Sequence, residues 1–526
     1  MVSGAQQECS IGLDLGTTAI KVIVFASRAD VNATHEAGEA QVAIASRPAA
    51  LRRSAEGAAE LDPQAQYTAL HEALADAVAQ AHGSGYRVAR IGISAAMHSL
   101  LAVAEDGTPL TPVLTWADLR AENDAEDLWS SPQGPALYAR TGTPVHAMTP
   151  LSKVLWLRRT RPEVFQRAVR FVGLKEWVWY RWFGEWKVDA SLASATGFYN
   201  LRERRWDAEA LAIAGIVERQ LSAVAPTEYL RADRLPDALR SIGLDDGCAL
   251  VIGASDGVLA NLGVHATDGK RMVLTLGTSA AVRIGGNQII TDARTRSFCY
   301  VLSEQQNLYV LGSPSNSGGA ALDWVYDRGS DALVMQAPTP PVSRLSLAEA
   351  LDAARQLSPS SDLYFLPYIA GERAPFWTTR TTGAFIGLRS EHTLIDELRA
   401  AVEGILLNAR WIAEPLLSQP QPPEAIMASG GALQSEWVRQ LAADIFGLPI
   451  YEIASVEASA QGAATLADLA CGVASWSDVA QPLTPTSVMR PSSATQAIYA
   501  HKGAKFRKLA QTLFDLSRES QSSESQ

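Results

Sequence analysis

The sequence predicts an α/β protein made of two related halves. Two observations lead to this fold class. Segments typical of strands alternate with segments typical of helices along most of the 526 residues, and one strand–turn–strand motif occurs twice, first at Leu13 and again at Leu274, an offset of 261 residues. At roughly 100–200 residues per domain, a chain of this length forms two to four domains. The offset is close to half the chain and therefore favours two.

The repeated motif is predicted to be a β-hairpin with a Gly-Thr turn. Residues 13–19 are LDLGTTA and residues 274–280 are LTLGTSA, so that five of the seven positions are identical. Alternating and branched apolar residues flank each turn, at 10–15 and 19–25 in the first copy and at 271–276 and 280–284 in the second. Chance similarity of two hairpins is the alternative, but the match at half the chain length favours duplication.

Other segments continue the alternation of strands and helices. We expect helices at 63–82, 256–262 and 436–446, and strands at 88–94, 249–253 and 425–428. A polar turn at 267–270 divides the halves, which predicts an N-terminal domain at 9–266 and a C-terminal domain at 267–505. Residues 506–526 are expected to contain the end of a helix and then a tail, disordered from Arg518 by its polar composition. The proline-rich stretch 338–341 is expected to be a surface loop.

Composition excludes several classes of function. The formal charge is −11 and the pI is about 5.4, which disfavours nucleic acid or an anionic membrane as a partner. No apolar run approaches the 18 residues of a transmembrane helix, and residues 1–8 lack the apolar stretch of a signal peptide. The four cysteines form no CxxC pair, so zinc and thioredoxin-type sites are not expected. The sequence therefore predicts a protein of the reducing cytoplasm.

The two hairpin turns are candidate phosphate-binding loops. A glycine followed by two hydroxyl residues offers backbone N–H and side-chain O–H donors to phosphate oxygens. The donors are Gly16, Thr17 and Thr18 in the first turn and Gly277, Thr278 and Ser279 in the second. Asp14 precedes the first turn and is a candidate Mg²⁺ carboxylate, whereas the second copy has Thr275 there. A solvated surface hairpin is the alternative. The pair predicts one nucleotide held between two related domains.

The segment Gly253-Ala-Ser-Asp-Gly257 allows two interpretations. It matches the G-x-S-x-G pattern of a serine hydrolase, in which Ser255 would be the nucleophile. That mechanism needs a histidine later in the chain, yet His265, His392 and His501 lack an obvious strand-end setting. In the other interpretation, Asp256 is the working group. A carboxylate at a strand end can orient a hydroxyl and accept its proton during phosphoryl transfer.

The sequence resembles the FGGY family of carbohydrate kinases over about residues 10–505. The segments that carry the resemblance are IGLDLGTTAIK at 11–21, GASDGVLANLG at 253–263, LTLGTSAAVR at 274–283 and ASGGALQSEWVRQLAADIFG at 428–447. Within the family, AMHSLLAV at 96–103, LTWADLR at 114–120 and LYFLPYIAGERAPFW at 363–377 are most similar to the members that phosphorylate gluconate. Xylulose kinases and other sugar kinases of the family are the alternative.

The resemblance implies two actin-like, ribonuclease-H-like ATPase domains with a catalytic cleft between them. It implies ATP-dependent phosphorylation of D-gluconate to 6-phosphogluconate, with Asp256 as the general base and Mg²⁺ at Asp14. Gly430 and Gly431 would lie against the adenosine. The sugar-facing positions would be Met97, His98, Trp116 and Asp118. Because both substrates are anions, His98, Arg120 and Lys153 are candidates for local positive charge. The expected partners are ATP and a sugar acid, with monomer and homodimer both open.

Overall fold

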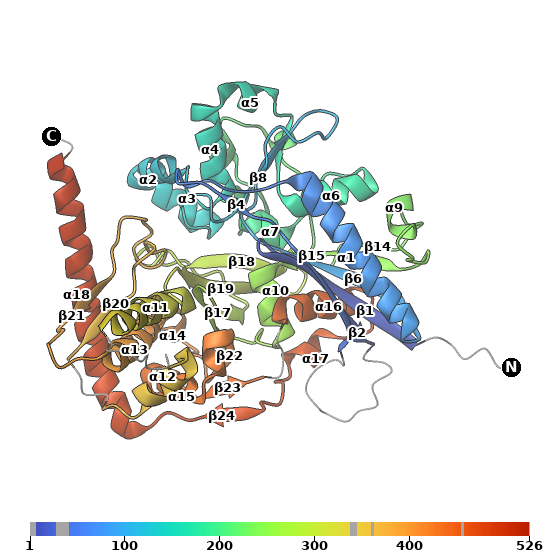
Figure 1. The fold of residues 1–526 in the computed structure, drawn as a ribbon. Coiled ribbons are helices and arrows are strands. Elements are labelled where there is room, and N and C mark those ends of the chain that lie inside the picture. The colour runs from blue at the N-terminus through green and yellow to red at the C-terminus, as the bar shows by residue number, and fades with distance from the viewer. Residues whose placement is uncertain (1–6, 28–40, 337–344, 359–361, 454–456, 525–526) are drawn as a thin grey trace.

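A computed structural model describes residues 7–27, 41–336, 345–358, 362–453 and 457–524 (Figure 1). The described chain forms two large β-sheets with helices packed around them, which confirms the predicted α/β class. Within these residues, no helix combines the length and the apolar character needed to cross a membrane.

In the first sheet, the carboxyl ends of three parallel strands lie side by side. Its order is β14 (Leu230–Arg231), β15 (Ala249–Ser255), β6 (Tyr86–Ala95), β1 (Gln7–Leu15), β2 (Ala19–Ala26) and β3 (Gln41–Pro48). β1 and β2 form the predicted antiparallel hairpin, while β6 runs parallel to both β1 and β15. Asp14 is paired in register with Ser94, and Asp256 directly follows β15. Both predicted carboxylates therefore leave the sheet at the same edge.

The second sheet repeats this arrangement. Its order is β18 (Phe298–Ser303), β19 (Leu308–Ser315), β17 (Ala280–Gly286), β16 (Arg271–Leu276), β22 (Ala425–Ser429), β23 (Ile450–Glu452) and β24 (Ser487–Met489). β16 and β17 form the second hairpin, and β22 lies parallel beside β16 as β6 does beside β1. Thr275 is in register with Ser429. The two hairpins thus occupy equivalent places in two similar sheets, which confirms the repeat.

A helix from the second half covers the first sheet. Helix α16 (Ala458–Ala470) lies against β1 and β6, and α10 (Asp256–Gly263) packs on α16 (Figure 1). The approach requires glycine, because a Cβ on Gly12 would lie 1.8 Å from the carbonyl oxygen of Ala460, and one on Gly92 equally close to that of Ala463. The division of the chain at 266/267 stays a prediction. The two halves pack against each other, since α16 of the second half lies on the sheet of the first.

The remaining predicted elements are present, with one difference at the C-terminus. The helices at 63–82 and 436–446 are α1 (Pro63–Gly83) and α15 (Glu436–Phe446). Composition predicted disorder from Arg518, whereas the structure has one helix, α18 (Ser493–Glu524). Its apolar side chains Tyr499, Phe506 and Ala510 are buried, and this packing stabilises the first part of the helix. The helix then continues into the polar C-terminal end, which composition alone does not predict to be helical. The loop predicted at 338–341 lies outside the described residues.

Candidate active site

Asp14 is held at the sheet edge by hydroxyl groups from two other elements. One carboxylate oxygen accepts a hydrogen bond from Ser94 Oγ of β6 at 2.7 Å, and the other accepts from Ser459 Oγ of α16 at 3.0 Å. Burial raises the pKa of Asp14, and the two hydroxyl hydrogen bonds oppose this rise. Each oxygen keeps a lone pair beyond its hydroxyl contact. Asp14 is therefore a fixed acceptor that can still bind a cation.

Asp256 begins helix α10 and faces the same region. Its Oδ1 accepts a hydrogen bond from the Gly257 backbone N–H at 2.8 Å. Burial, followed by the negative charge of Asp14, raises the pKa of Asp256 to about 6, while the Gly257 hydrogen bond and the charge of Arg283 oppose the rise. A carboxylate with a pKa in this range can accept a proton near neutral pH.

The geometry around Ser255 contradicts the serine-hydrolase interpretation. The Ser255 side chain is fully buried, and its Oγ lies 3.1 Å from Ser191 Oγ. The Ser255 backbone N–H donates to the same Ser191 oxygen at 3.2 Å. Among the described residues, no histidine hydrogen-bonds to this hydroxyl. Ser255 is thus a buried structural residue without a base to activate it.

The first phosphate loop contacts a sugar-facing residue. The Trp116 indole Nε1–H donates to Thr17 Oγ1 at 3.2 Å, so the Gly16–Thr18 turn and the predicted sugar side are neighbours. Thr18 is exposed. A phosphate at this turn would therefore lie beside a molecule resting on Trp116.

The second phosphate loop is anchored by the start of a helix. Helix α11 (Gly319–Gln336) begins against it, because the Gly319 N–H donates to the Gly277 carbonyl at 2.7 Å and the Ala320 N–H to the Thr278 carbonyl at 3.2 Å. A Cβ on Gly318 would lie 2.5 Å from the Ser279 carbonyl carbon. Gly318 and Gly319 therefore allow α11 to approach the second phosphate loop closely. The pair of adjacent glycines after a strand is the signal in the sequence for this contact.

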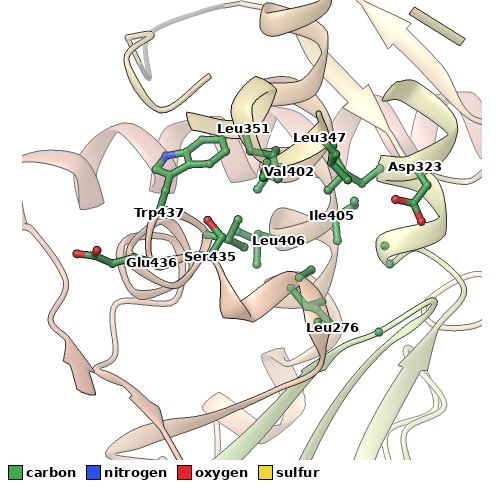
Figure 2. A pocket seen from close by; sticks show the side chains of 18 of the residues that line it. Leu276, Asp323, Leu347, Leu351, Val402, Ile405, Leu406, Ser435, Glu436 and Trp437 are labelled. Atoms are coloured by element: carbon green, nitrogen blue, oxygen red, sulfur yellow. The ribbon is translucent and has the colours of Figure 1, made fainter. Parts of the chain in front are cut away.

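A cavity of about 840 Å³ opens beside this loop (Figure 2). Gly277, Thr278 and Gly431 line it, together with aliphatic side chains of α12 (Leu347–Arg355) and α13 (Leu394–Ile412). Figure 2 shows those side chains around the cavity, with Trp437 and Asp323 at different parts of its wall; they are Leu347, Leu351, Val402, Ile405 and Leu406. Apolar walls next to a phosphate loop suit a heteroaromatic base attached to phosphates.

Gly430 and Gly431 have different structural reasons to be glycine. Gly430 has φ 96°, and a Cβ there would lie 2.4 Å from the Leu276 carbonyl oxygen. Nothing lies within 4 Å of a Cβ on Gly431, which lines the cavity. At Gly430 the chain's own backbone already requires glycine, whereas at Gly431 the cavity is the reason that remains; that both glycines lie against the adenosine stays a prediction.

His98 and Met97 lie at the predicted sugar side, but His98 carries no charge there. The His98 Nδ1–H donates to the Ala195 carbonyl at 2.8 Å, and its ring lies edge-on to Tyr300. Burial and then the charge of Lys153 lower the pKa of His98 to about 3. Met97 is next to Asp256, since its Cε lies 3.0 Å from a Cβ position on Gly257. His98 can thus offer a hydrogen-bonding Nε2 but not the predicted positive charge.

Arg120 and Asp118 neutralise each other. Arg120 Nε donates to Asp118 Oδ1 at 3.0 Å, and its Nη2 donates at 2.6 Å to both Asp118 Oδ2 and Glu60 Oε1. Asp118 is almost fully buried and also accepts from the Ala59 N–H at 3.1 Å. The ion pairs with Asp118 and Glu60 offset the charge of Arg120, which weakens its candidacy for supplying positive charge; that Asp118 and Arg120 face the sugar stays a prediction.

Lys153 is also committed to the protein. Its fully buried Nζ donates to the backbone carbonyls of His98, Thr115 and Met148 at 2.6, 2.7 and 2.8 Å. Burial lowers the pKa of Lys153 to about 7, which the charge of Asp118 partly offsets. Lys153 therefore connects the segments that carry His98 and Trp116, and its Nζ donates to three backbone carbonyls; a contact with the substrate stays a prediction.

Three further arginines, which the sequence does not single out, make no ion pair with any described residue. Arg283 of β17 donates to Thr275 Oγ1 at 2.7 Å, and its charge acts on Asp256. The Arg296 guanidinium stacks on Trp129 at 4.5 Å, and that of Arg373 lies 5.3 Å from the centre of the Trp116 ring. Arg373 belongs to the GERAPFW segment that carries part of the family resemblance, but its spacing alone indicates no role.

The donor set around Asp14 suits Mg²⁺. The described residues contain no group of three or more His, Cys, Asp or Glu side chains able to hold a metal ion by themselves. Mg²⁺ bound with a nucleotide commonly uses one or two carboxylates together with phosphate oxygens and water. Asp14 provides such a partial set, together with Asp256, whose pKa the nearby charge of Asp14 raises.

Two related sheets, a nucleotide-sized cavity and two facing carboxylates define a phosphotransferase of two similar lobes. The model of the FGGY family of carbohydrate kinases, N-terminal domain, matches residues 9–263, and that of the C-terminal domain matches residues 272–471. The chain belongs to the FGGY family of carbohydrate kinases. The predicted family and its two-domain fold are confirmed.

Individual relatives point to two sugar specificities. The chain is 37% identical to the gluconokinase of Bacillus subtilis (strain 168) over 464 residues, which cover 88% of this chain and 87% of that one. Two solved structures from Lactobacillus acidophilus are each 32% identical with a TM-score of 0.87 and cover 96% of this chain and 98% of theirs. One is described as a gluconate kinase and the other as a ligand-bound xylulose kinase.

Proposed function

We propose that the protein transfers the γ-phosphoryl group of ATP to the terminal hydroxyl of D-gluconate, giving ADP and 6-phosphogluconate. The observation that carries the proposal is the environment of Asp256, in which burial and the charge of Asp14 raise its pKa to about 6 and the charge of Arg283, from the second hairpin, opposes the rise. The 37% identity to a gluconokinase and the arginines without carboxylate partners support a sugar acid over a ketose. Xylulose is the second candidate, because a structure described as a xylulose kinase matches equally well.

Catalysis in this proposal consists of alignment and charge stabilisation. Asp256 holds the substrate hydroxyl in line with the γ-phosphorus and accepts its proton late, as the new O–P bond forms. The loops at Gly16–Thr18 and Gly277–Ser279 donate N–H and O–H groups to the phosphates, and the cavity beside Gly431 holds the adenosine. Met97, His98 and Trp116 position the sugar chain.

Asp14 would hold Mg²⁺, which supplies positive charge against the phosphate oxygens when it is bound. Ser94 and Ser459 keep the Asp14 carboxylate in one orientation. Burial of the reacting groups between the lobes would limit the transfer of phosphate to water. ATP, Mg²⁺ and a cytoplasmic location belong to the same proposal, which leaves monomer and homodimer open.

A coupled ADP-release assay with D-gluconate, D-xylulose, glycerol and no sugar tests the proposal. We expect ADP release to depend on gluconate and the D256N variant to lose about 10²–10⁴-fold in kcat. The matched control is S255A, one residue away, which should largely keep kcat because the Ser255 hydroxyl hydrogen-bonds to Ser191 and to no other described residue. Sugar-independent ADP release, or a fully active D256N, would contradict the proposal, and a preference for xylulose would select the second candidate.

A further inference from the structure

Arg373 lies where the sugar-facing residues meet the second half of the chain. Its guanidinium faces the ring of Trp116, and the same indole donates to Thr17 of the first phosphate loop. The positive charge of Arg373 also acts on His98 and Tyr300, whose rings pack edge to face. Arg373 is therefore the cation that borders the predicted sugar side from the C-terminal half.

Only one edge of the Arg373 guanidinium is occupied by the protein. Nε donates to Asn316 Oδ1 at 2.9 Å, and Nη2 donates to the Ser315 carbonyl at 2.9 Å. Nη1 makes no hydrogen bond to any described residue, and the side chain is only partly buried. A planar guanidinium that is fixed on one edge and stacked on a ring presents its remaining N–H groups in a defined direction.

The neighbouring carboxylate does not neutralise Arg373. Glu372 is almost fully buried, and its oxygens accept from Ser317 Oγ at 2.6 Å, Ser315 Oγ at 2.8 Å and the Asn316 N–H at 2.6 Å. Asn408 of α13 adds a fourth donor at 3.2 Å. No ion pair forms between Glu372 and the Arg373 guanidinium. Glu372 instead fixes the backbone from which Arg373 projects, and the guanidinium keeps its charge for a ligand.

The other cations of the region are engaged or wrongly placed. Arg120 and Lys153 are occupied by carboxylates and carbonyls, as described above. Arg283 acts on Asp256, which in the proposed function binds the hydroxyl that receives phosphate. The carboxylate of gluconate is at the opposite end of its carbon chain. Arg296 is enclosed between Trp129 and Trp377 and lines a different cavity of about 730 Å³ that also contains Glu122 and Glu126.

We infer that Arg373 binds the carboxylate of the substrate and thereby gives the site its preference for an aldonic acid over the neutral polyol of the same length. This inference rests on the proposed function. The carboxylate would occupy the open edge of the guanidinium, and the sugar chain would extend past Trp116 and His98 toward Asp256. Charge-assisted hydrogen bonds of this kind are among the stronger polar contacts in proteins.

The test compares D-gluconate with D-glucitol, which has a neutral CH₂OH in place of the carboxylate. In the full-length enzyme, R373Q should lower kcat/KM for gluconate by about 10–10²-fold more than it lowers kcat/KM for glucitol. The KM for ATP should stay within about twofold, since the nucleotide cavity does not include Arg373. R296Q is the matched control, because it also removes a partly buried, ring-stacked arginine. It should leave the gluconate-to-glucitol ratio unchanged.

An unchanged ratio in R373Q, or a collapse of the ratio in R296Q instead, would overturn the inference. Should R373Q fail to fold in a thermal melt, R373K answers the same question. Lysine keeps the charge but not the fixed fork, so the ratio should fall by at least about fivefold, and an unchanged ratio again overturns the inference. A wild-type enzyme without preference for gluconate would contradict the proposed function itself and is therefore a distinct result.

Discussion

At the scale of single residues, the site depends on how buried charges influence one another. Asp14 at the end of β1 and Asp256 directly after β15 lie on either side of β6, and the negative charge of Asp14 disfavours the ionised form of Asp256. Arg283 opposes this effect from the second sheet. Arg283 is itself held by Thr275, the residue that replaces Asp14 in the second copy of the repeat. Thr275, in place of a carboxylate, thus leaves the charge of Arg283 free to lower the pKa of Asp256 in the other half.

The pH dependence of the reaction should report this balance. Asp256 acts in its ionised form, so kcat/KM should fall as the pH drops through about 6. In R283M the charge that favours the carboxylate is removed, the pKa of Asp256 rises, and the acid limb should move to higher pH. The profile of kcat/KM for wild type and R283M between pH 4.5 and 9 measures the shift. A limb that stays in place, or moves to lower pH, would show that Arg283 does not act on the base.

At the scale of elements, the two turns and the loop after β22 are built by close backbone contacts. Gly430 brings this loop against Leu276 and Gly277 at the start of the second phosphate loop. Gly431, the next residue, faces open space. The backbone conformation therefore requires glycine at Gly430, whereas at Gly431 the absence of a side chain leaves the cavity open.

This difference predicts that the same substitution lowers stability at Gly430 and leaves it unchanged at Gly431. G430A places a Cβ 2.4 Å from a carbonyl oxygen at a positive φ, and should lower the free energy of unfolding by about 1–3 kcal/mol. G431A meets no atom within 4 Å and should leave the unfolding free energy within about 0.5 kcal/mol of wild type. Urea unfolding followed by tryptophan fluorescence compares the two. Equal stability of the variants would remove the backbone explanation for Gly430.

The sequence predicts these elements because their signals are local. A short stretch of sequence is enough to predict each hairpin, the strand before Asp256 and the Ser-Gly-Gly turn. The structure has them at the expected positions. The partners of charged side chains are not local. Arg120, Lys153 and Arg373 look alike as isolated positive residues, and only the folded chain shows that the first two are occupied and the third is open.

At the scale of the whole molecule, the two halves are joined by helix α16 across the first sheet. This packing buries an ion pair between Asp468 of α16 and Arg90 of β6, with exposed side-chain fractions of 1% and 5%. Ser10 of β1 also donates to Asp468 at 2.6 Å. Because one partner comes from each half, the pair connects the folding of one lobe to that of the other, which the repeat in the sequence does not reveal.

Removing Asp468 should therefore destabilise the protein strongly. D468A removes the buried carboxylate and leaves Arg90 with only the partly exposed Glu8 as an ion-pair partner among the described residues. Breaking a buried pair from one side costs about 3–5 kcal/mol, although replacing both partners by apolar groups can be nearly neutral. The matched control is D237A, which breaks an Asp–Arg pair on the surface, where the Asp237 side chain is 92% exposed. That change should lower stability by less than about 1 kcal/mol. Urea unfolding of both variants, monitored by circular dichroism and tryptophan fluorescence, measures the difference. A D468A variant no less stable than D237A would show that the buried pair does not hold the halves together.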